Sequence, residues 1–478
     1  MKFSKKNVIT ASLAVTLAAA VVLGGGTYAY LQSNTGDTVN TFNTNKVMVE
    51  LQETTGQTYN IVPGTSQDKD PTVTVDNTVD AYVYVEVTDN TQELVDYTIA
   101  DGWTELYGYT GVYYRAVAAG ASEKSFSVLA GNKVYYSAEL ENEDMLDDGA
   151  LKTGIELTFK AYAVQQYPFA DAAAAFEGKD SVIAEDDTTA AEAIEQGEPV
   201  VLAKDVSLPS STLTGAGSAD INLNNRELNI SGSSYVQVAD GESFSLKNGT
   251  VKWDNTNTLV SVRAGEGSTI SFENVEMDMG GKSILVDYGT EAARIDIIDS
   301  EIYSDDNYCI STNASDLTTG KDVIINVINS TLTAAHSSGD STAILMNVPG
   351  TLTIKNSNIT AGRQAVIVRT GTAAISNSTL TSTLAADESL WAKYDNTGWG
   401  SGNEVPVAVL VVGDRSAAYP WDASCTIGEN VKLVFGKQTD RKAIYAAAYD
   451  GQKTTVSGVT ADMVTVSEEN SGDVTVSE

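Results

Sequence analysis

Hydrophobic and polar residues follow two different patterns along the chain, and the change falls near residue 178. Before it, apolar and polar residues alternate with a period of two, which predicts half-buried β-strands. In residues 82–87 the valines fall on one face, and Tyr82, Tyr84 and Glu86 fall on the other. We therefore predict an antiparallel sandwich over residues 30–178, with the valines in its core. The expected strands are 47–51, 72–75, 81–87, 112–117, 125–129 and 155–164.

After residue 200, a unit of short strands and a polar turn repeats without helical periodicity. The turn centres are separated by 26, 25, 30, 27 and 21 residues. A unit of this size cannot bury its apolar face alone and must stack on its neighbours. We predict a right-handed parallel β-helix over residues 200–478, with a second sandwich as the alternative. In the β-helix, each turn Asn or Asp is expected to have a left-handed backbone conformation and to hydrogen-bond to the equivalent residue of the next coil. The turn centres are Asn248, Asn274, Asp299, Asn329, Asn356 and Asn377.

Residues 179–199 are predicted to form a linker and a cap on the β-helix. Polar and acidic residues dominate residues 177–189 without strand alternation, and a short helix is expected over 188–196 with Thr188 or Thr189 as its N-cap. A second acidic run around residues 144–148 is interpreted as a solvated loop, with a calcium site as the alternative. The expected fold class is all-β.

Residues 1–29 have the features of an export signal. Three lysines precede an apolar run over residues 8–23, and small residues lead to a cleavage site between Ala29 and Tyr30. An uncleaved membrane anchor is the alternative, but the run is short and rich in Ala and Gly. We expect a secreted protein that meets a signal peptidase during export and has no stable membrane span after cleavage.

The net charge limits which classes of partner the chain can bind, and the few His and Cys residues limit which metal sites it can form. The chain has 29 basic and 64 acidic residues, and loss of three lysines with the signal shifts the charge from −35 to −38. Such a surface repels phosphate backbones, so nucleic acid is excluded as a partner. His336, Cys309 and Cys425 are the chain's complement of His and Cys, which leaves no set of ligands for a zinc site. We predict that the chain binds no cofactor and no metal. We also predict that Cys309 and Cys425 are free thiols buried in the interior.

The first domain resembles the TasA/camelysin family through a series of separated motifs in the family's order. The resemblance implies a Gram-positive protein exported through a dedicated signal peptidase, a jelly-roll sandwich, and assembly into biofilm fibres. It also implies that Ala29 ends the signal and that residues 30–42 can leave their own domain. The motifs are GGTYAYLQSNTGDTVNTF at 25–42, VPG at 62–64, KDPTV at 69–73, DN at 76–77, AYV at 81–83, GW at 102–103, YY at 113–114, AG at 119–120 and KAYAVQ at 160–165.

An open sandwich has unpaired edge strands, which a strand from a neighbouring copy can complete. We predict that the new N-terminus is that donor strand and that Leu31, Val39 and Phe42 anchor it, so the expected partner is the chain itself in a fibre or homo-oligomer. An ordinary intramolecular first strand is the alternative. Camelysin is described as a metalloprotease, but residues 30–178 contain no His or Cys, so proteolysis is not expected.

The second domain resembles pectate-lyase-like β-helices in its repeat period and turn chemistry, a fold that hosts polysaccharide lyases and hydrolases. Asp305 and Asp306 are slightly similar to a polygalacturonase motif, but no His-bearing partner follows, and adjacent residues of a strand point to opposite faces. A lyase needs a basic residue beside acidic calcium ligands. Arg263, Arg294 and Arg369 lie in the coils and are the candidates for that base. We predict no catalytic residue and no enzyme, with polysaccharide lyase or hydrolase activity as the minority reading.

An aromatic stretch interrupts the repeat between residues 377 and 407. Aromatic faces stack on the apolar faces of sugars, so Trp391, Tyr394, Trp399 and Trp421 are candidate glycan-binding residues. The alternative is that these rings pack on the flank of the β-helix. Together these features predict an exported structural protein of the cell surface or biofilm matrix that assembles by strand donation. The alternative function is a polysaccharide-binding adhesin or a polysaccharide-active, lyase-like β-helix protein.

Overall fold

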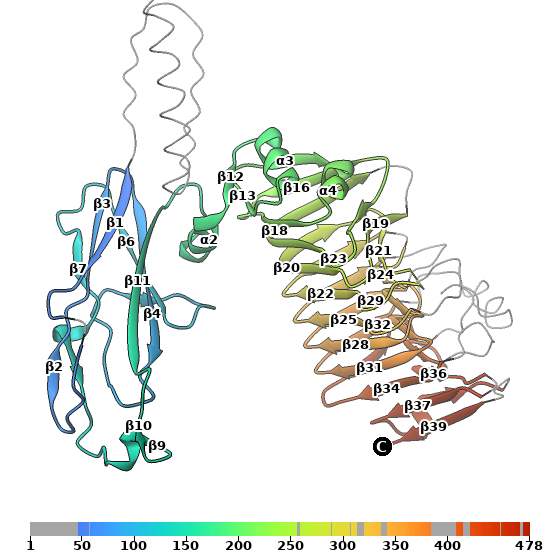
Figure 1. Cartoon of the computed structure of the whole chain (residues 1–478). Coiled ribbons are helices and arrows are strands. Elements are labelled where there is room, and N and C mark those ends of the chain that lie inside the picture. The colour runs from blue at the N-terminus through green and yellow to red at the C-terminus, as the bar shows by residue number, and fades with distance from the viewer. Residues whose placement is uncertain are drawn as a thin grey trace, which may run out of the picture. The chain divides into compact units, whose positions relative to one another are not determined.

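The computed structural model describes residues 46–478 apart from 57, 256–258, 288, 306, 313–319, 336–341, 384–407, 414–420, 450 and 469–471. The chain divides into two compact units between residues 180 and 181. The fold is all-β: a jelly-roll sandwich is followed by a right-handed parallel β-helix (Figure 1). The predicted cleavage site at Ala29 and Tyr30, and the predicted donor residues Leu31, Val39 and Phe42, lie outside the described residues.

The sandwich has two main antiparallel sheets, whose strand orders are β1-β3-β7 and β11-β4-β6-β5. Valines at alternate positions of β3 and β4 supply the centre of the core, with Val73, Val75, Val83 and Val85 at most 1% exposed. The predicted strands are present with shifts of a few residues at their ends. The strands are β1 (Val47–Gln52), β2 (Ser66–Asp68), β3 (Thr72–Asn77), β4 (Ala81–Asn90), β5 (Thr104–Glu105), β6 (Val112–Val117), β7 (Ser125–Ser127), β8 (Lys133–Tyr135), β9 (Leu146–Asp147), β10 (Ala150–Leu151) and β11 (Glu156–Gln165).

The tyrosine-rich outer face of the second sheet is covered by a helix, which the period-two pattern of the sandwich did not predict. Helix α2 (Ala172–Glu177) begins at Asp171, whose side chain accepts a hydrogen bond from Ala174 N. Its Phe176 packs on Tyr84, with ring centroids 5.1 Å apart, and Tyr84 Oη donates to Ala172 O at 2.7 Å. Tyr84 is therefore fully buried, whereas the alternation alone predicted a half-buried face.

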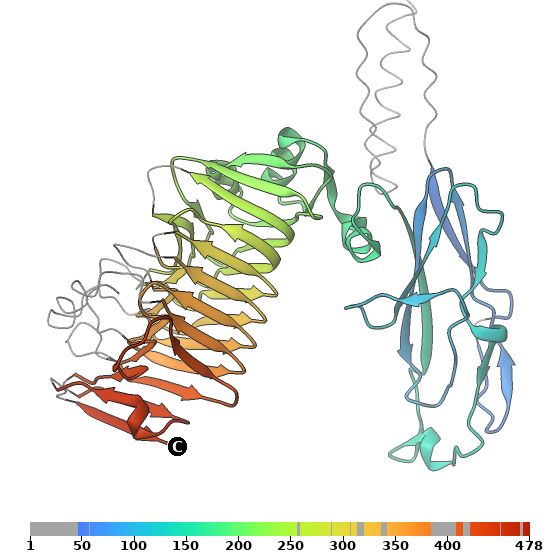
Figure 2. The same cartoon turned by 180° about the vertical axis from the view of Figure 1, so that it is seen from behind.

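Each coil of the β-helix has three strand positions, which form two parallel sheets running the length of the unit (Figures 1 and 2). The first and second positions belong to one sheet of 19 strands, because β18 and β20 continue through the turn between them. That sheet contains β12 (Val182–Ala184), β13 (Val200–Leu202), β14 (Val206–Pro209), β15 (Ala219–Asn222), β16 (Glu227–Gly232), β18 (Ser243–Asn255), β20 (Thr269–Asp278), β22 (Arg294–Ile298), β23 (Glu301–Ser304), β25 (Val323–Ile328), β26 (Thr331–Ala334), β28 (Gly350–Lys355), β29 (Asn358–Ala361), β31 (Gly371–Ser376), β32 (Thr379–Ser382), β34 (Ala423–Ile427), β35 (Lys432–Phe435), β37 (Lys453–Ser457) and β39 (Asp473–Ser477).

The third strand position forms a separate sheet of nine strands. The pattern of short apolar runs predicted most of these strands to within a few residues, because each is buried on its inner face. They are β17 (Val236–Gln237), β19 (Val260–Arg263), β21 (Ser283–Leu285), β24 (Ile310–Ser311), β27 (Ile344–Met346), β30 (Val366–Val368), β33 (Leu410–Val412), β36 (Ile444–Ala446) and β38 (Val464–Val466).

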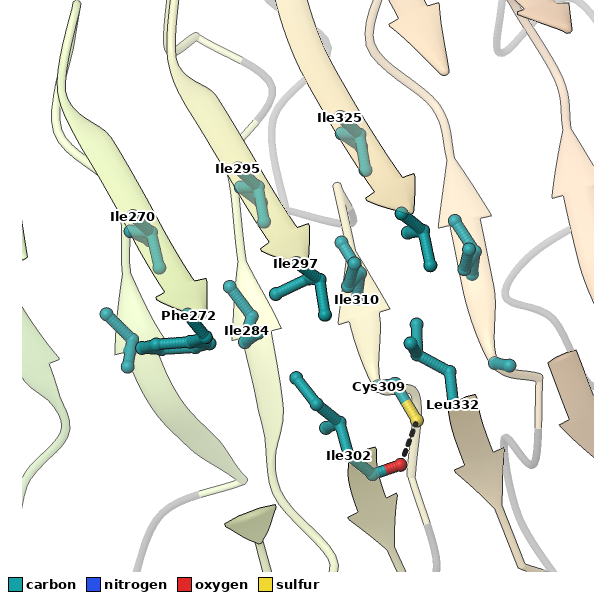
Figure 3. Packing of buried hydrophobic residues seen from close by; sticks show 14 of the residues in the cluster. Ile270, Phe272, Ile284, Ile295, Ile297, Ile302, Cys309, Ile310, Ile325 and Leu332 are labelled. Atoms are coloured by element: carbon teal, nitrogen blue, oxygen red, sulfur yellow. Dashed lines mark hydrogen bonds between the residues drawn. The ribbon is translucent and has the colours of Figure 1, made fainter. Parts of the chain in front are cut away.

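In-register pairing stacks the inward side chains of successive coils into continuous apolar rows. Ile270, Ile295 and Ile325 occupy one such row and are each 0% exposed (Figure 3). The row continues through Leu352 and Ala373 to Cys425, which takes a position that Ile, Leu or Ala fills in the preceding coils. Stacking thus merges all coils into one hydrophobic core.

The turn between the first two strand positions has the predicted left-handed conformation in every repeat that the sequence identified. The six turn centres have φ between 49° and 58°. Asn274 Nδ2 donates to Asn248 Oδ1 at 3.0 Å, and Asn356 Nδ2 donates to Asn329 Oδ1 at 3.0 Å. These bonds confirm the predicted side-chain ladder, because Asn tolerates this conformation and carries both a donor and an acceptor.

A buried serine ladder runs beside the asparagines. In four successive coils the residue after the turn centre is a serine that is 2–3% exposed. Ser330 is typical: its hydroxyl donates to Ile328 O at 2.7 Å and accepts from Ser300 N at 3.1 Å. Each hydroxyl therefore satisfies a main-chain group of its own coil and one of the coil before it. The four serines are Ser300, Ser330, Ser357 and Ser378.

Two helices lie at the N-terminal end of the β-helix: α3 (Asp187–Glu195) and α4 (Ser210–Ala216). Ala190, Ala193 and Ile194 of α3 join the apolar core, so this helix caps the first coil. The N-cap is Asp186, which accepts from Thr189 N at 2.8 Å; the prediction of Thr188 or Thr189 as cap was wrong by two or three residues. Strand β12 (Val182–Ala184) lies within residues 179–199, which were predicted to be linker and cap, so the first strand of the β-helix sheet precedes the predicted start at residue 200.

The serine ladder gives a direct test of the stacking. We expect Ser330→Ala to lower the free energy of unfolding by about 1–3 kcal/mol, because it leaves the buried Ser300 N–H without an acceptor. Ser376→Ala on an outward position of β31 is the matched control and should change stability by less than about 0.5 kcal/mol. Chemical denaturation followed by circular dichroism measures both. Equal, small effects would contradict an energetic role for the ladder.

Candidate functional site

At one turn centre of the asparagine ladder, Asp299, a carboxylate takes the place of the amide. Asp299 has no N–H to donate to Asn274 of the preceding coil. Within the described residues, no hydrogen bond joins the Asp299 side chain to either neighbour in the ladder. A turn centre whose residue type departs from the Asn of the surrounding repeats is a candidate for function rather than for folding.

Two glutamates lie beside this interruption on adjacent coils. Glu276 of β20 and Glu301 of β23 are directly opposite each other in the parallel register, and both are exposed. Neither forms an ion pair within the part of the chain that the structure describes. Like charges directly opposite on a sheet are destabilising, so this pair is maintained at a cost to stability.

The glutamates and the ladder residues line a surface groove of about 400 Å³. The groove crosses several coils, because its lining residues come from the turns and second strands of successive repeats. The neighbouring lysines are engaged elsewhere: Lys252 Nζ lies 2.6 Å from a carboxylate oxygen of Glu227, and Lys247 Nζ lies 3.7 Å from Asp220 Oδ1. The lining residues are Asn225, Gly249, Thr250, Asn274, Val275, Glu276, Asp299 and Glu301.

An exposed aromatic ring lies next to this acidic groove. Tyr303 is two residues after Glu301 on β23, so both side chains point outward, and the tyrosine residue is 40% exposed. Tyr303 Oη donates to Asp305 Oδ1 at 3.3 Å. Partial burial, followed by the charges of Asp305 and Asp278, raises the pKa of the Tyr303 hydroxyl, which keeps it a neutral donor. The groove and this ring form one outward surface, which we call the acidic flank.

The acidic flank combines two kinds of contact that proteins use to bind sugars. An exposed tyrosine face can stack on the apolar face of a sugar, and carboxylates and amides accept or donate hydrogen bonds to its hydroxyls. Backbones of neighbouring coils are about 4.8 Å apart. Carboxyl groups about 5–5.5 Å apart can serve as nucleophile and general acid at a glycosidic bond, so this spacing suits Glu276 and Glu301.

The acidic flank was not predicted from the sequence. The available signal was positional: Glu276 and Glu301 each follow their turn centre by two residues, and Asp299 is the only acidic member of the six turn centres. Aligning the repeats on those centres would have placed the two glutamates on the same outward row. Without that alignment, Glu276 and Glu301 are two of many acidic residues.

Most of the predicted glycan-binding residues fall where the structure gives no description. Trp391, Tyr394 and Trp399 lie outside the described residues, so their role stays a prediction. Trp421 is described and is half-buried, and its main-chain oxygen accepts from Gln452 Nε2 at 2.6 Å. Its place in the fold is thus fixed at least in part by its backbone.

The arginines considered for lyase chemistry are held in the fold. Arg263 forms an ion pair with Asp287 and donates to Tyr235 Oη at 2.9 Å. Arg294 Nε donates to Asp296 Oδ2 at 2.6 Å, and Arg369 is 0% exposed. Because a proton-abstracting base must reach its substrate, burial disfavours Arg369, whereas the carboxylate contacts of Arg263 and Arg294 occupy their guanidinium groups.

The other candidate groups do not assemble into a centre among the described residues. Asp305 is exposed and accepts a hydrogen bond from the Tyr303 hydroxyl, whereas Asp306 and His336 lie outside the described residues. In the described part of the chain, no group of three or more His, Cys, Asp or Glu residues is arranged to hold a metal ion. The described helices include none long and apolar enough to cross a membrane.

The two cysteines are free and fully buried, which confirms the prediction of interior thiols. Burial raises the pKa of both thiols to about 12. Cys309 Sγ lies 4.0 Å from Ile302 O, the weak contact drawn in Figure 3. Neither thiol is a nucleophile at neutral pH, because the thiolate is the reactive form.

Comparisons with known proteins found no matching family model and no matching curated protein. Three solved structures show a weak likeness, each over 90% of this chain and 95% of the other. One is the catalytic domain of a GH87 alpha-1,3-glucanase bound to tetrasaccharides, with 9% identity and a TM-score of 0.34. Another is the catalytic unit of a thermostable GH87 alpha-1,3-glucanase from Streptomyces thermodiastaticus, with 14% identity and a TM-score of 0.32. The third, bound to nigerose, has 10% identity and a TM-score of 0.26.

These neighbours contradict the expectation that the chain is not an enzyme, since all three are catalytic parts of glycoside hydrolases. That prediction was wrong. It rested on the scarcity of His and Cys and on the opposed directions of Asp305 and Asp306, whereas glycoside hydrolysis needs only two suitably placed carboxyl groups. The likeness itself assigns no substrate to this chain.

The buried thiols generate a simple chemical test. With a pKa raised to about 12, both thiols stay protonated at pH 8, so the folded protein should not react with an aromatic disulfide reagent over an hour. In denaturant the thiol pKa returns to about 8.5, and two equivalents should react within minutes. Rapid reaction of the folded protein would contradict the burial of Cys309 and Cys425.

Proposed function

We propose that this chain is an exported protein that binds a polysaccharide on the acidic flank of its β-helix and cleaves it there. The observation that carries the proposal is the in-register pair Glu276 and Glu301, which lines a groove beside the exposed ring of Tyr303. A like-charge pair without an ionic partner has no evident structural benefit. Two carboxyl groups on neighbouring coils are the minimum set for glycoside hydrolysis.

The charge of the site selects the substrate class. Glu276, Asp299 and Glu301 line the groove, and the whole chain has a charge of −35. A polymer of uronic acids would be repelled from such a surface. We therefore propose a neutral polysaccharide as the substrate, in contrast to the acidic substrates of pectate lyases.

The roles of the two glutamates follow from the chemistry of retaining glycosidases. One carboxylic acid protonates the leaving oxygen, and the other carboxylate attacks the anomeric carbon to form a glycosyl-enzyme that water then hydrolyses. Tyr303 orients the sugar by stacking at the edge of the groove. The parallel backbone pairing of β20 with β23 fixes the spacing of the two coils, so the carboxyl groups are held in place by the β-helix itself.

The proposal predicts opposite effects on activity and stability. Glu276→Gln and Glu301→Gln should each lower the release of reducing ends from a neutral polysaccharide by about 10²-fold or more. Each should also raise the free energy of unfolding by about 0.2–1 kcal/mol, because a like-charge contact is relieved. Reducing-end assays and chemical denaturation measure the two effects.

Glu273→Gln is the matched control, because Glu273 is also exposed on β20 but lies opposite Lys247 and outside the groove. It should leave activity unchanged. A wild-type chain that neither binds nor cleaves any neutral polysaccharide would overturn the proposal. Binding without cleavage would refute the catalytic roles and leave a binding protein.

A second candidate function, self-assembly through the sandwich, is favoured by an open seam in that unit. Strands β1 and β11 lie side by side at the ends of their sheets, and no ladder joins them among the described strands (Figure 1). Their inward side chains are only half-buried, whereas those of the central strands are fully buried. A strand from a neighbouring copy would pair with a free edge and cover these side chains. The half-buried inward residues are Val47, Val49, Leu51, Leu157, Phe159, Ala161 and Ala163.

This second candidate agrees with the fibre assembly implied by the TasA/camelysin resemblance, and it has its own test. A chain that begins at Tyr30 should form filaments visible by electron microscopy. A chain of equal length in which Gly and Ser replace residues 30–42 should not, because it keeps the length but loses Leu31, Val39 and Phe42. Filaments of equal abundance from both chains would exclude donation by this segment.

A further inference from the structure

The sandwich contains a pocket of about 430 Å³ that the proposed function does not use. It opens where the segment after β1 meets the start of β11. Part of its lining is apolar, from Ile61, Val95, Val134 and Leu157. Its size falls within the range of about 300–1,000 Å³ that is usual for small-molecule sites.

A buried ammonium group lines this pocket. The Lys69 side chain is only 9% exposed, and its Nζ donates to Glu53 Oε1 at 2.7 Å. The same Nζ lies 4.9 Å from the ring centroid of Tyr59 and 5.4 Å from that of Phe159. An ammonium group has three N–H donors, and among the described residues Glu53 is its one hydrogen-bond acceptor. Because buried donors are normally satisfied, an occupant of the pocket would supply a further acceptor.

The wall of the pocket is held in place before any ligand arrives. Asp70 accepts hydrogen bonds from the main-chain N–H and the hydroxyl of both Thr54 and Thr55. These bonds hold the pKa of the Asp70 carboxyl well below its usual range. Tyr59 Oη donates to Gly56 O at 2.6 Å, which closes the same loop. The Lys-Asp-Pro motif at 69–71 thus has a physical role, since its Lys and Asp fix the loop that forms the wall.

The charges around the pocket favour a neutral ligand. The Lys69 charge is balanced by Glu53, and the rim contributes the exposed carboxylate of Glu156. An anionic ligand would therefore meet a net negative site, whereas a neutral carbonyl is an acceptor without a charge. The threonine hydroxyls of the lining, at Thr58, Thr91 and Thr158, can bond to further polar groups of the ligand.

We propose that this pocket binds an N-acetylated amino sugar. Its acetamido oxygen accepts a hydrogen bond from Lys69 Nζ, and its methyl group packs against the apolar lining at Val134 and Leu157. The sugar hydroxyls face the threonines and Glu156 at the rim. The site is separate from the acidic flank and does not depend on the function proposed for it.

Ligand-observed NMR on the full chain tests the proposal with three probes: N-acetylglucosamine, glucosamine and glucose. N-acetylglucosamine should bind, and the other two should bind at least tenfold more weakly, because they lack the acetamido group. No binding of N-acetylglucosamine, or equal binding of all three sugars, would overturn the proposal. Preference for an acetylated peptide over the acetylated sugar would also overturn it.

Two variants locate the binding. Lys69→Met combined with Glu53→Gln removes the donor without leaving a buried charge, and it should weaken binding at least tenfold. Thr158→Trp fills the rim from an exposed position and should also weaken binding, so the test survives if the first variant does not fold. Lys133→Met and Thr104→Trp are matched controls outside the pocket and should bind normally. Unchanged binding in Thr158→Trp, or a loss in Glu276→Gln, would place the sugar elsewhere.

Discussion

The β-helix depends on the parallel ladder that holds each coil in register with the next. No single coil can bury its apolar face, so core, turn and outer surface exist only as stacks. Register then fixes the identity of neighbours: Ile270 lies on Ile295, Asn248 lies on Asn274, and Glu276 lies on Glu301. The same constraint that stabilises the first two pairs forces the third pair together.

The polar groups along the turn show how closely the coils are matched. Each buried serine hydroxyl satisfies one carbonyl in its own coil and one N–H in the preceding coil, so loss of one hydroxyl affects two coils. The asparagine ladder adds bonds between side chains at the surface. Asp299 departs from this order at the coil where the groove opens, which is why we place function there.

The two units differ in whether the edges of their sheets are paired. In the β-helix, ladders on both sides consume the edges of all coils except the terminal ones, and α3 caps the first coil. In the sandwich, β1 and β11 have an edge that no described strand pairs with, over half-buried apolar side chains. Free edges of this kind are available to an additional strand. The outer face of the second sheet is instead closed internally, by α2 on Tyr84 and its neighbours.

Periodicity determined much of the architecture in advance. Period-two alternation located the main sandwich strands, and the Asn and Asp turn centres located the coils, because strand geometry and the left-handed turn impose local requirements on residue type. Local pattern could not reveal that α2 covers Tyr84, since this depends on which segments meet. The cap of α3 is a local contact between Asp186 and Thr189, which the sequence analysis placed two or three residues too late.

By itself, the sequence determined that the chain is an all-β sandwich followed by a stacked helix, and that its thiols are interior. Only the tertiary structure decided which acidic residues act together: Glu276 and Glu301 are 25 positions apart along the chain, and the coil register makes them neighbours. Likewise, Lys69 and Leu157 share a pocket because the segment between β1 and β3 lies beside the start of β11. Repeats report their own period, whereas a site is a set of contacts between segments, and those contacts form only when the coils and sheets pack.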